Sequence, residues 1–469
     1  MAKDIQSRFE ALQSSTSRLR NSSAEERAQK LTALWEAILD KKQVLFDAGA
    51  EERGCHELDI AAELVMLKSE IDYARKHVAS WMKPKKVKNS LSTIGKRCEI
   101  RYQSKGVLLN MAAYNAPTVE SFVPLIAAIC SGNSCAIKPS ELAPKSAHII
   151  KDIVSAALKP DEVDVFIGDV ETAKTLISLP FDHIYYTGGT AVGKIVMKAA
   201  ADNLTSITLE MGGKNPVIID ETAKLENAAT KLAWGRVMNA GQVCIAPDYA
   251  IVHESVKDEF QRLISEQINA QYNSDGAGLE SSNYVPRIIN ERHTQRVKDL
   301  IDDAVKKGAA VISGGSANIK ANYIEPTILT DVTEDMAIMQ EEVFGPVLCV
   351  VGYKNREEVL DYIKPRRNPL ALYIYSTDNE AIEYFLTNTS SGSAVVNNNC
   401  VQAGTNPRLP MGGIGASGMG RIGGFAGFQS MSNERSIVHQ PLDKFRDFLI
   451  QLPPYSDKYS GLIMKGLKK

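Results

Sequence analysis

HIYYTGGTAVGKIVMKAAA, residues 183–201, contains the pattern that decides the fold: a short apolar run, a glycine-rich turn and a helical stretch. The run HIYY has the length and the side chains of a buried β-strand. Gly188, Gly189 and Gly193 let the backbone pass close to a ligand, and a helix N-terminus attracts phosphate oxygens. The stretch therefore predicts a parallel strand that leads into a phosphate-binding turn.

The same alternation of strand and helix extends from this stretch in both directions. Before it come GVLLNM (106–111), SFVPLIAAICSG (121–132) and SCAIKPS (134–140), and after it come SITLEMG (206–212), NPVIID (215–220) and VLCVVGY (347–353). Strands that alternate with helices at this interval indicate a parallel sheet with helical crossovers. We expect an α/β fold with two doubly wound α/β domains, preceded by a helical layer over residues 1–92.

Length and composition favour a large soluble enzyme. A chain of 469 residues is too long for one ordinary core, and 44% apolar with 23% charged residues is a globular mixture. The net charge of -2 gives no field that would attract nucleic acid. The seven cysteines form no CxxC pair and no secretory leader is recognisable, so we expect free thiols in the cytoplasm and no metal site.

The C-terminal tail, residues 446–469, has a pattern of its own. FRDFLIQLPPY (445–455) and GLIMKGLKK (461–469) place apolar residues beside basic ones, as segments that lie on a membrane surface do. A packed or frayed tail gives the same pattern and is the interpretation that we favour. Peripheral membrane contact by the tail is the alternative.

Cys244 and Glu210 are the candidate catalytic residues. Cys244 lies in NAGQVCIAPDY (239–249), just after a helical run that ends in small residues, where a thiol can be exposed. Taken alone, a free cysteine is more often a small buried hydrophobe. Glu210, in TLEMGGKNP (208–216), ends an apolar strand 34 residues earlier. Its position suits a general base beside a pocket, although a strand-end carboxylate on a turn has the same pattern.

Two further segments are candidates for binding a nucleotide, and a third is a glycine-rich loop. Lys138 and Glu141, in AIKPSE (136–141), end a strand and are suited to ribose hydroxyls or phosphate, although a solvated strand-end pair is an equal explanation. EEVFGPV (341–347) combines carboxylates with Phe344, whose ring is suited to packing beside a flat heteroaromatic ring, and core packing is the alternative. LPMGGIGASGMGR (409–421) has too many glycines for a helix or strand and predicts a tightly folded loop.

These elements, in this order, resemble the aldehyde dehydrogenase superfamily from about residue 10 to about residue 440. LEMGGKNP (209–216) is similar to the glutamate motif of that family and NAGQVCIAP (239–247) to its cysteine motif. The interval of 34 residues between Glu210 and Cys244 fits the usual separation. YTGGTAVGKIVMKAAA and APDY most resemble the class 3 branch, which acts on fatty and aromatic aldehydes.

The resemblance implies a catalytic role for three residues. Cys244 would attack the aldehyde carbon, and the oxyanion of the thiohemiacetal would be held by Asn115, in AAYNAP (112–117), and by the backbone N–H of Cys244. Hydride transfer to the nicotinamide would leave a thioester. Glu210 would then activate the water that hydrolyses it.

The resemblance also implies the cofactor NAD, with NADP as an alternative. The turn Gly188, Gly189, Thr190, Ala191, Val192 and Gly193 matches the GxTxxG turn of the family. Lys138 and Glu141 match the positions beside the adenosine ribose, and Glu342 and Phe344 match those beside the nicotinamide.

A division into domains and a homodimer follow from the same resemblance. A small β oligomerisation arm is expected, built partly by strands near 95–106 and 425–440. The expected units are an NAD(P)-binding domain (1–94 and 107–209), a catalytic domain (210–405), an oligomerisation and bridging segment (95–106 and 406–445) and the tail (446–469).

Several positions near the expected substrate depart from the common pattern of the family. AYNAP replaces the usual PWNYP, which adds Tyr114 to the predicted pocket residues, and Met411 replaces the phenylalanine of the usual PFGG. The predicted apolar walls beside the nucleophile are Trp234, Met238, Val243 and Ile245. Such walls predict an alkyl or aromatic aldehyde, although these residues could equally be part of a helix core.

Two other functions stay open at this point. A CoA-acylating or reductive relative would pass the thioester to a thiol, but a hydrolytic base such as Glu210 has little use there. A non-catalytic family member is the second alternative. The complete set of Cys244, Glu210 and Asn115 argues against it.

Overall fold

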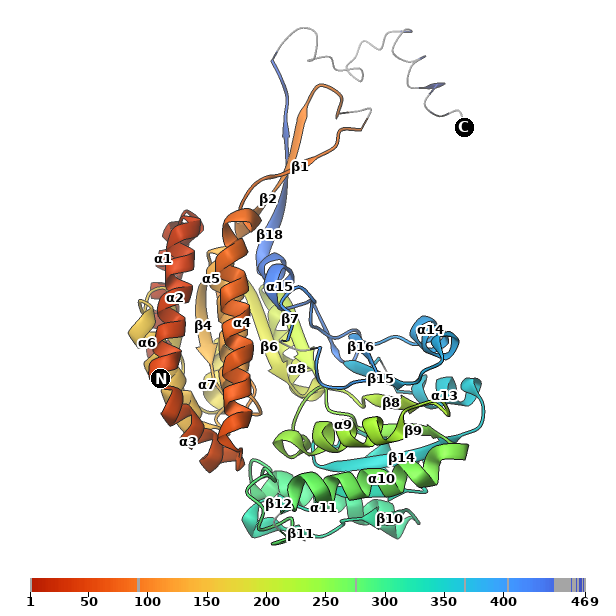
Figure 1. Cartoon of the computed structure of the whole chain (residues 1–469). Coiled ribbons are helices and arrows are strands. Elements are labelled where there is room, and N and C mark those ends of the chain that lie inside the picture. Colours follow the sequence, from red (N-terminus) through yellow and green to blue (C-terminus); the bar gives the residue numbers. More distant parts are fainter. Residues whose placement is uncertain are drawn as a thin grey trace.

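The computed structural model describes residues 2–90, 93–274, 276–366, 368–402 and 405–442, with 457, 461, 464–465 and 467. Two layered α/β units lie against each other, and a narrow β arm projects from the first of them (Figure 1). The expected α/β fold is confirmed. Most of the C-terminal tail, 446–469, lies outside the described residues, so the alternatives for it are not tested.

The first unit is built on a six-stranded sheet in the order β17-β7-β6-β3-β4-β5. Five of its strands are parallel, and β17 runs antiparallel to β7. The strands are β3 (Val107–Met111), β4 (Ser134–Lys138), β5 (Val163–Val165), β6 (His183–Gly188), β7 (Ser206–Met211) and β17 (Gly418–Met419). Because the strands depart from β3 to both sides, the sheet is doubly wound.

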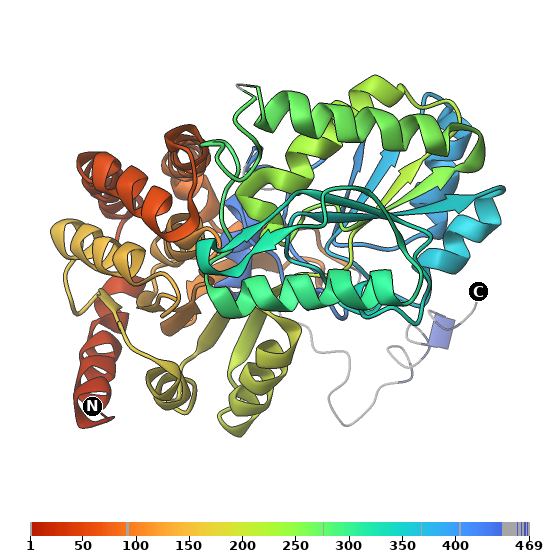
Figure 2. The same ribbon diagram turned by 90° about the horizontal axis from the view of Figure 1, so that it is seen from below.

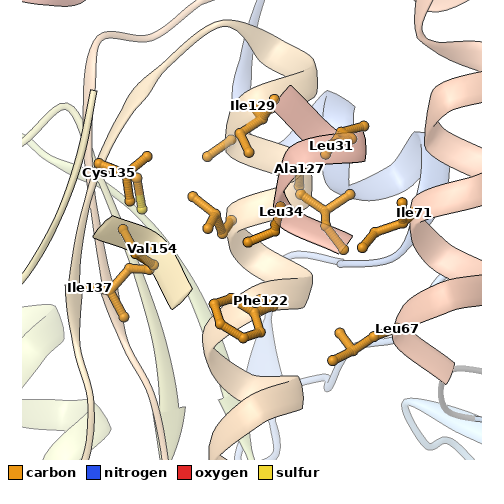
Figure 3. Close-up of a cluster of buried hydrophobic side chains, with 14 of the residues drawn as sticks. Leu31, Leu34, Leu67, Ile71, Phe122, Ala127, Ile129, Cys135, Ile137 and Val154 are labelled. Carbon is orange, nitrogen blue, oxygen red and sulfur yellow. The ribbon is translucent and has the colours of Figure 1, made fainter. Parts of the chain in front are cut away.

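Helices cover both faces of this sheet. One face carries α2 (Ala24–Asp40), α4 (Glu57–Trp81), α5 (Pro117–Ser131) and α6 (Pro144–Ala157), with α3 (Lys42–Arg53) joining α2 to α4. The other face carries α1 (Ala2–Arg20), α7 (Val170–Ile177) and α8 (Thr190–Asp202). Figure 3 shows the first core, where Leu34 of α2, Leu67 of α4 and Phe122 of α5 meet Ile137 of β4.

The second unit is built on a seven-stranded sheet in the order β10-β13-β14-β9-β8-β15-β16. All of its pairs are parallel except β10 with β13. The strands are β8 (Pro216–Ile219), β9 (Tyr249–His253), β10 (Ala310–Ser313), β13 (Thr327–Thr330), β14 (Val347–Tyr353), β15 (Ala371–Tyr375) and β16 (Ser393–Val396).

Two layers of helices enclose the second sheet as well (Figure 2). α9 (Leu225–Val237) and α10 (Glu254–Tyr272) cover one face. α11 (Glu291–Lys306), α12 (Ala337–Gln340), α13 (Arg356–Ile363) and α14 (Asn379–Asn388) cover the other. The short elements are η2 (Met238–Gly241), β11 (Ala317–Asn318), η3 (Ile319–Ala321) and β12 (Tyr323–Ile324).

The arm is a three-stranded antiparallel sheet in the order β1-β2-β18. Its strands are β1 (Lys85–Val87), β2 (Arg97–Ser104) and β18 (Ser432–His439), and α15 (Gly424–Ser430) precedes the last of them. The helical prediction over 1–92 is wrong at Lys85–Val87. The physical reason is Pro84, which cannot continue α4, so that the exposed residues after it pair with β2 instead.

Within the described residues, no helix combines the length and the hydropathy that a membrane crossing requires.

Candidate active site

The carboxyl ends of four parallel strands bring the predicted site residues of the first unit to one edge. Lys138 and Gly188 are the last residues of β4 and β6, and Glu210 is the last but one of β7. Asn115 lies between the end of β3 and Pro117, the first residue of α5. Ligands of doubly wound sheets bind at this edge, where the strand order reverses, here between β3 and β6.

Cys244 comes to this edge from the second unit, on the loop that enters β9. Three successive residues of that loop, Asn239, Ala240 and Gly241, have positive φ angles of 48°, 53° and 70° and turn the chain sharply after α9. The side chain of Asn215 donates to the carbonyl oxygens of Cys244 and Ala246 at 2.9 and 3.0 Å. The carboxyl edge of the first sheet therefore faces a loop that precedes a strand of the second.

Asn115 is held beside this loop by its own amide group. The side-chain Nδ2 of Asn115 donates to the backbone carbonyl oxygen of Gln242 at 3.0 Å. The backbone carbonyl oxygen of Asn115 accepts from the side chain of Asn239 at 2.9 Å. An amide nitrogen carries two hydrogens, so a second donor remains on Asn115. This is the group that the sequence predicts as the oxyanion donor.

Glu210 is a buried carboxyl group without a hydrogen-bond partner for either oxygen among the described residues. Burial raises the pKa of Glu210 to about 8, the nearby carboxylate of Glu120 adds to the rise, and Arg421 opposes it. The glycine-rich loop 409–421 closes over the group. Gly418 pairs with Glu210, and a Cβ added to Gly412 would come within 2.9 Å of its Oε1. The pair of unsatisfied oxygens is therefore oriented and shielded by backbone.

Cys244 is partly exposed, and its thiol lies among carboxyl groups. Burial raises the pKa of Cys244 well above its ordinary value, and the carboxylates of Glu120, Glu210 and Glu342 raise it further. At neutral pH the sulfur therefore carries its proton, and an attack by Cys244 requires a group that removes it.

Glu342 and the glycines that follow Glu210 fit together. A Cβ on Gly212 would collide with both carboxyl oxygens of Glu342, so the Gly-Gly pair after β7 makes room for this side chain. Burial raises the pKa of Glu342 to about 8, and the neighbouring Asp248 contributes. The EEVFGPV segment, predicted to bind the nicotinamide side, thus lies against the strand end that carries Glu210.

The rings of Phe344 and Tyr114 contact each other close to Glu342. Their ring centroids are 6.1 Å apart in an edge-to-face arrangement, and Phe344 has a positive φ of 45°. Tyr114 also lies 5.8 Å from the ring of His293. Phe344 is only half-buried, so core packing does not account for its position.

The turn between β6 and α8 is open where a phosphate would lie. A Cβ added to Gly189 would meet nothing within 4 Å, and no side chain of the described residues caps the N-terminus of α8. A Cβ on Gly193 would collide with the sulfur of Met211, so this glycine lets α8 pack closely on β7. Thr190 begins the helix. The free N–H groups of its first turn suit phosphate oxygens.

Lys138 and Glu141 form an ion pair at the end of β4. The ammonium of buried Lys138 donates to the exposed carboxylate of Glu141 at 2.9 Å and to the carbonyl oxygen of Pro139 at 2.9 Å. Partial burial raises the pKa of Glu141, but the hydrogen bond and the charge of Lys138, together with a backbone hydrogen bond, outweigh it and the net shift is downward. The pair lies at the same sheet edge as the phosphate turn, as a ribose site requires.

A cavity of about 250 Å³ lies beside α9. Trp234 and Met238, two of the predicted pocket residues, line it. The other lining residues are His56, Leu58, Asp59, Gln271, Tyr272, Tyr284 and Pro286. Val243 is half-buried and packs against the core of the second unit, and Ile245 is a buried member of that core. Two of the four predicted wall residues, Trp234 and Met238, thus line the cavity, and Met238 also packs against the core together with Val243.

Arg53 is a site residue that sequence reasoning missed. This fully buried guanidinium at the end of α3 donates to the carbonyl oxygen of Asn115, donates to Asn239 Oδ1 at 3.4 Å and pairs with Glu63 at 3.3 Å. It therefore fixes the backbone that carries the oxyanion donor. No local motif marks it, since an arginine at a helix end ordinarily interacts with the helix dipole.

Arg53→Met should destabilise the protein by about 3–5 kcal/mol, because the change leaves the carboxylate of Glu63 buried and unpaired. Thermal and urea unfolding measure the loss. The double variant Arg53→Met with Glu63→Gln should lose less than the two single changes together. A single variant as stable as the unchanged protein would contradict the role of Arg53.

A model of the aldehyde dehydrogenase family matches residues 1–437. The 4,4'-diaponeurosporen-aldehyde dehydrogenase of Staphylococcus aureus is 38% identical over 92% of this chain and 93% of its own length. The dimeric NADP-preferring aldehyde dehydrogenase of Canis lupus familiaris is 36% identical over 91% of this chain and 93% of its own.

Solved structures agree with these relatives. The substrate-bound state of Staphylococcus aureus AldH superposes with a TM-score of 0.93 at 36% identity and covers 99% of both chains. The NAD+ complex of an aldehyde dehydrogenase from Bacillus cereus has a TM-score of 0.82 at 25% identity and covers 93% of this chain and 89% of its own. The chain therefore belongs to the aldehyde dehydrogenase family, whose members are NAD(P)-dependent oxidoreductases.

Proposed function

We propose that the protein oxidises medium- or long-chain aliphatic or aromatic aldehydes to carboxylic acids through a thioester on Cys244. The observation that carries this proposal is the buried carboxyl group of Glu210, whose two oxygens have no partner among the described residues beside a partly exposed cysteine. An unsatisfied buried carboxyl group is costly, and a site that hydrolyses a thioester has a use for it.

The first step is the attack of Cys244 sulfur on the aldehyde carbon. The thiol gives its proton to solvent water as the C–S bond forms, and the carbonyl oxygen becomes the oxyanion of a thiohemiacetal. The second hydrogen of Asn115 Nδ2 and the backbone N–H of Cys244 stabilise that oxyanion. Arg53 keeps Asn115 in place for this bond.

The residues fit a dinucleotide cofactor, NAD by preference and NADP as the alternative. The open space at Gly189 and the uncapped first turn of α8 fit the diphosphate, Lys138 and Glu141 fit the adenosine ribose, and Glu342 and Phe344 line the nicotinamide side. When bound, the cofactor supplies the hydride acceptor of the oxidation.

The last step is hydrolysis, for which Glu210 is the base. Its carboxylate takes a proton from a water molecule whose oxygen attacks the thioester carbon. The C–S bond breaks, the thiolate of Cys244 leaves and takes a proton from solvent water, and the carboxylic acid is released. With a pKa of about 8, the ionised carboxylate of Glu210 is a stronger base than an ordinary carboxylate, and the ionised fraction grows as the pH rises through 8.

The apolar substrate class is supported by the cavity beside α9 and by a relative. Trp234, Met238, Leu58 and Pro286 give the cavity apolar walls. The Staphylococcus aureus relative is named for an aldehyde, 4,4'-diaponeurosporen-aldehyde. Tyr114 is not among the residues that line this cavity, and its ring packs edge-to-face on Phe344, which we propose for the nicotinamide side.

We also propose that the first unit binds the cofactor, that the second carries the nucleophile, and that the arm joins two copies into a homodimer. The arm presents β1 as an exposed edge strand, which suits pairing between chains. All seven cysteines are free, which supports a cytoplasmic protein.

The test is a panel of aldehydes with NAD and with NADP, monitored by the absorbance of the reduced cofactor and by the acid formed. Medium-chain and aromatic aldehydes should yield the acid in the absence of CoA. Acyl-CoA formed only when CoA is supplied would favour the acylating alternative. A lack of cofactor reduction with every aldehyde would favour the non-catalytic one.

Asn115→Ala should lower kcat by about 10²-fold, because one oxyanion donor is worth roughly 3 kcal/mol. KM for the aldehyde should change far less, since the donor acts when charge develops on the oxygen. Steady-state kinetics with saturating cofactor measure both. A loss confined to KM would contradict the oxyanion role.

A further inference from the structure

Glu120 is a half-buried residue whose carboxyl group the mechanism above does not use. It lies in the first turn of α5, and the first turn is fixed by the side chain of Asn110, which donates to the carbonyl oxygens of Glu120 and Ser121 at 3.1 and 3.0 Å. Because α5 follows β3 and packs on β3 and β4, on the same face of the sheet as Tyr185, its first turn lies at the carboxyl edge of the sheet, where Glu120 acts on Glu210.

The strand register brings a hydroxyl group and Glu210 to that face. Thr187 of β6 and Glu210 of β7 are direct partners in the parallel ladder, so their side chains lie next to each other on one face. Tyr185, two residues before Thr187, shares this face and belongs to the core under α5. Within the described residues, neither the Thr187 hydroxyl nor either carboxyl oxygen of Glu210 makes a hydrogen bond of acceptable geometry.

The charges that surround the two carboxyl groups come from several elements. Glu120 faces Glu63 of α4 as well as Glu210, and Arg421 of the glycine-rich loop faces Glu210. Cys244 and Tyr185 face both carboxyl groups. Burial raises the pKa of Glu120 to about 7, with the Thr187 hydroxyl opposing the rise and Glu63 adding to it. Two neighbouring carboxyl groups of this kind titrate as a coupled pair, so the charge of one changes the pKa of the other.

We propose that Glu120 acts through Glu210 as the acceptor of the proton that Glu210 removes from the hydrolytic water. The proton on Glu210 passes to the carboxylate of Glu120, directly or by way of the Thr187 hydroxyl, which accepts one proton and donates another. Glu210 returns to its carboxylate form, and the half-buried Glu120 then loses the proton to solvent. No oxidant or further reactant is involved.

This inference rests on the proposed function and makes a specific prediction for Glu120→Gln. The amide cannot take up the proton, so steady-state turnover should fall about 10-fold while the first-turnover burst of reduced cofactor keeps its amplitude. The amide also removes a like charge beside Glu210. The pKa of Glu210 should therefore fall, and the rise of kcat with pH should shift to lower pH by about one unit.

The experiment compares the burst and the pH profile of kcat in the unchanged protein, Glu120→Gln, Glu120→Asp and Glu70→Gln. Glu70 is the matched control, since it is a buried carboxyl group with a pKa raised to about 7 that accepts a bond from Gly424 N–H, away from the site. Glu70→Gln should leave the pH profile in place. Glu120→Asp should restore the profile and most of the turnover.

The outcomes distinguish a failure of the proposed function from a failure of the proposed role of Glu120. An unchanged protein without a burst would sink the proposed function itself. An unchanged protein with a burst, beside a Glu120→Gln variant with the same kcat and the same pH profile, would overturn the role of Glu120. Loss of the burst in Glu120→Gln would also overturn it, because the group would then be needed before hydrolysis or for the fold.

Discussion

Cys244→Ala is expected to reduce aldehyde oxidation by about 10⁴-fold or more, because the variant has no nucleophile with which to form the thioester. Binding of the cofactor should persist, since the α8 turn and the Lys138–Glu141 pair lie in the other unit. The measurement is kcat/KM for a medium-chain aldehyde together with cofactor binding by fluorescence.

The matched control for this variant is Cys98→Ala. Of the seven cysteines, all within the described residues, Cys98 and Cys244 are partly exposed and the other five are buried. Cys98 lies in the arm on β2, so its loss should leave oxidation unchanged. Activity that survives in Cys244→Ala, or alkylation of the unchanged protein at Cys98 with full inactivation, would refute the assignment of the nucleophile.

Glu210→Gln is expected to slow steady-state turnover by about 10²–10⁴-fold while the burst of reduced cofactor in the first turnover persists. The amide occupies nearly the same volume as the carboxyl group but cannot take a proton from water. The thioester should therefore accumulate, and mass spectrometry of the acid-quenched protein should find the acyl group on Cys244. Equal losses of the burst and of turnover would place Glu210 before the thioester instead.

The pH dependence gives a second readout of Glu210. Burial favours the neutral acid and raises its pKa to about 8, whereas catalysis as a base requires the carboxylate. The kcat of the unchanged protein should therefore rise with pH through about 8 and level off above it. This limb should be absent in Glu210→Gln. A limb of the same shape in the variant would assign the titration to another group.

The sequence by itself determined the fold class and the residue types of the chemistry. Strand-length apolar runs that alternate with helical stretches specify parallel sheets locally, and HIYY followed by glycines predicts the β6 turn because each feature depends on a few consecutive residues. The arm strand at Lys85–Val87 was missed for the opposite reason. Its partner lies beyond a turn, and a short exposed polar run has no periodicity of its own.

The site was predictable to a smaller extent, because its parts come from distant places in the chain. Motif and spacing marked Cys244, Glu210 and Asn115. They did not show that Met238 lines the cavity while Ile245 is buried in the core, because this difference depends on how the loop after α9 turns. Residues 239–241 have left-handed backbone conformations, which turn the chain there, and the sequence does not reveal these conformations.

Tertiary structure alone decided the roles of Arg53 and Glu120. Arg53 reaches Asn115 across 62 positions of the chain, and Glu120 faces Glu210 because the first turn of α5 lies at the carboxyl edge of the sheet, on the face that Tyr185 shares. Neither residue belongs to a motif, since a buried charge is specified by what surrounds it and not by its neighbours in sequence. Sequence thus determined which reactive groups this protein has, and packing determined how their protons and hydrogen bonds are shared.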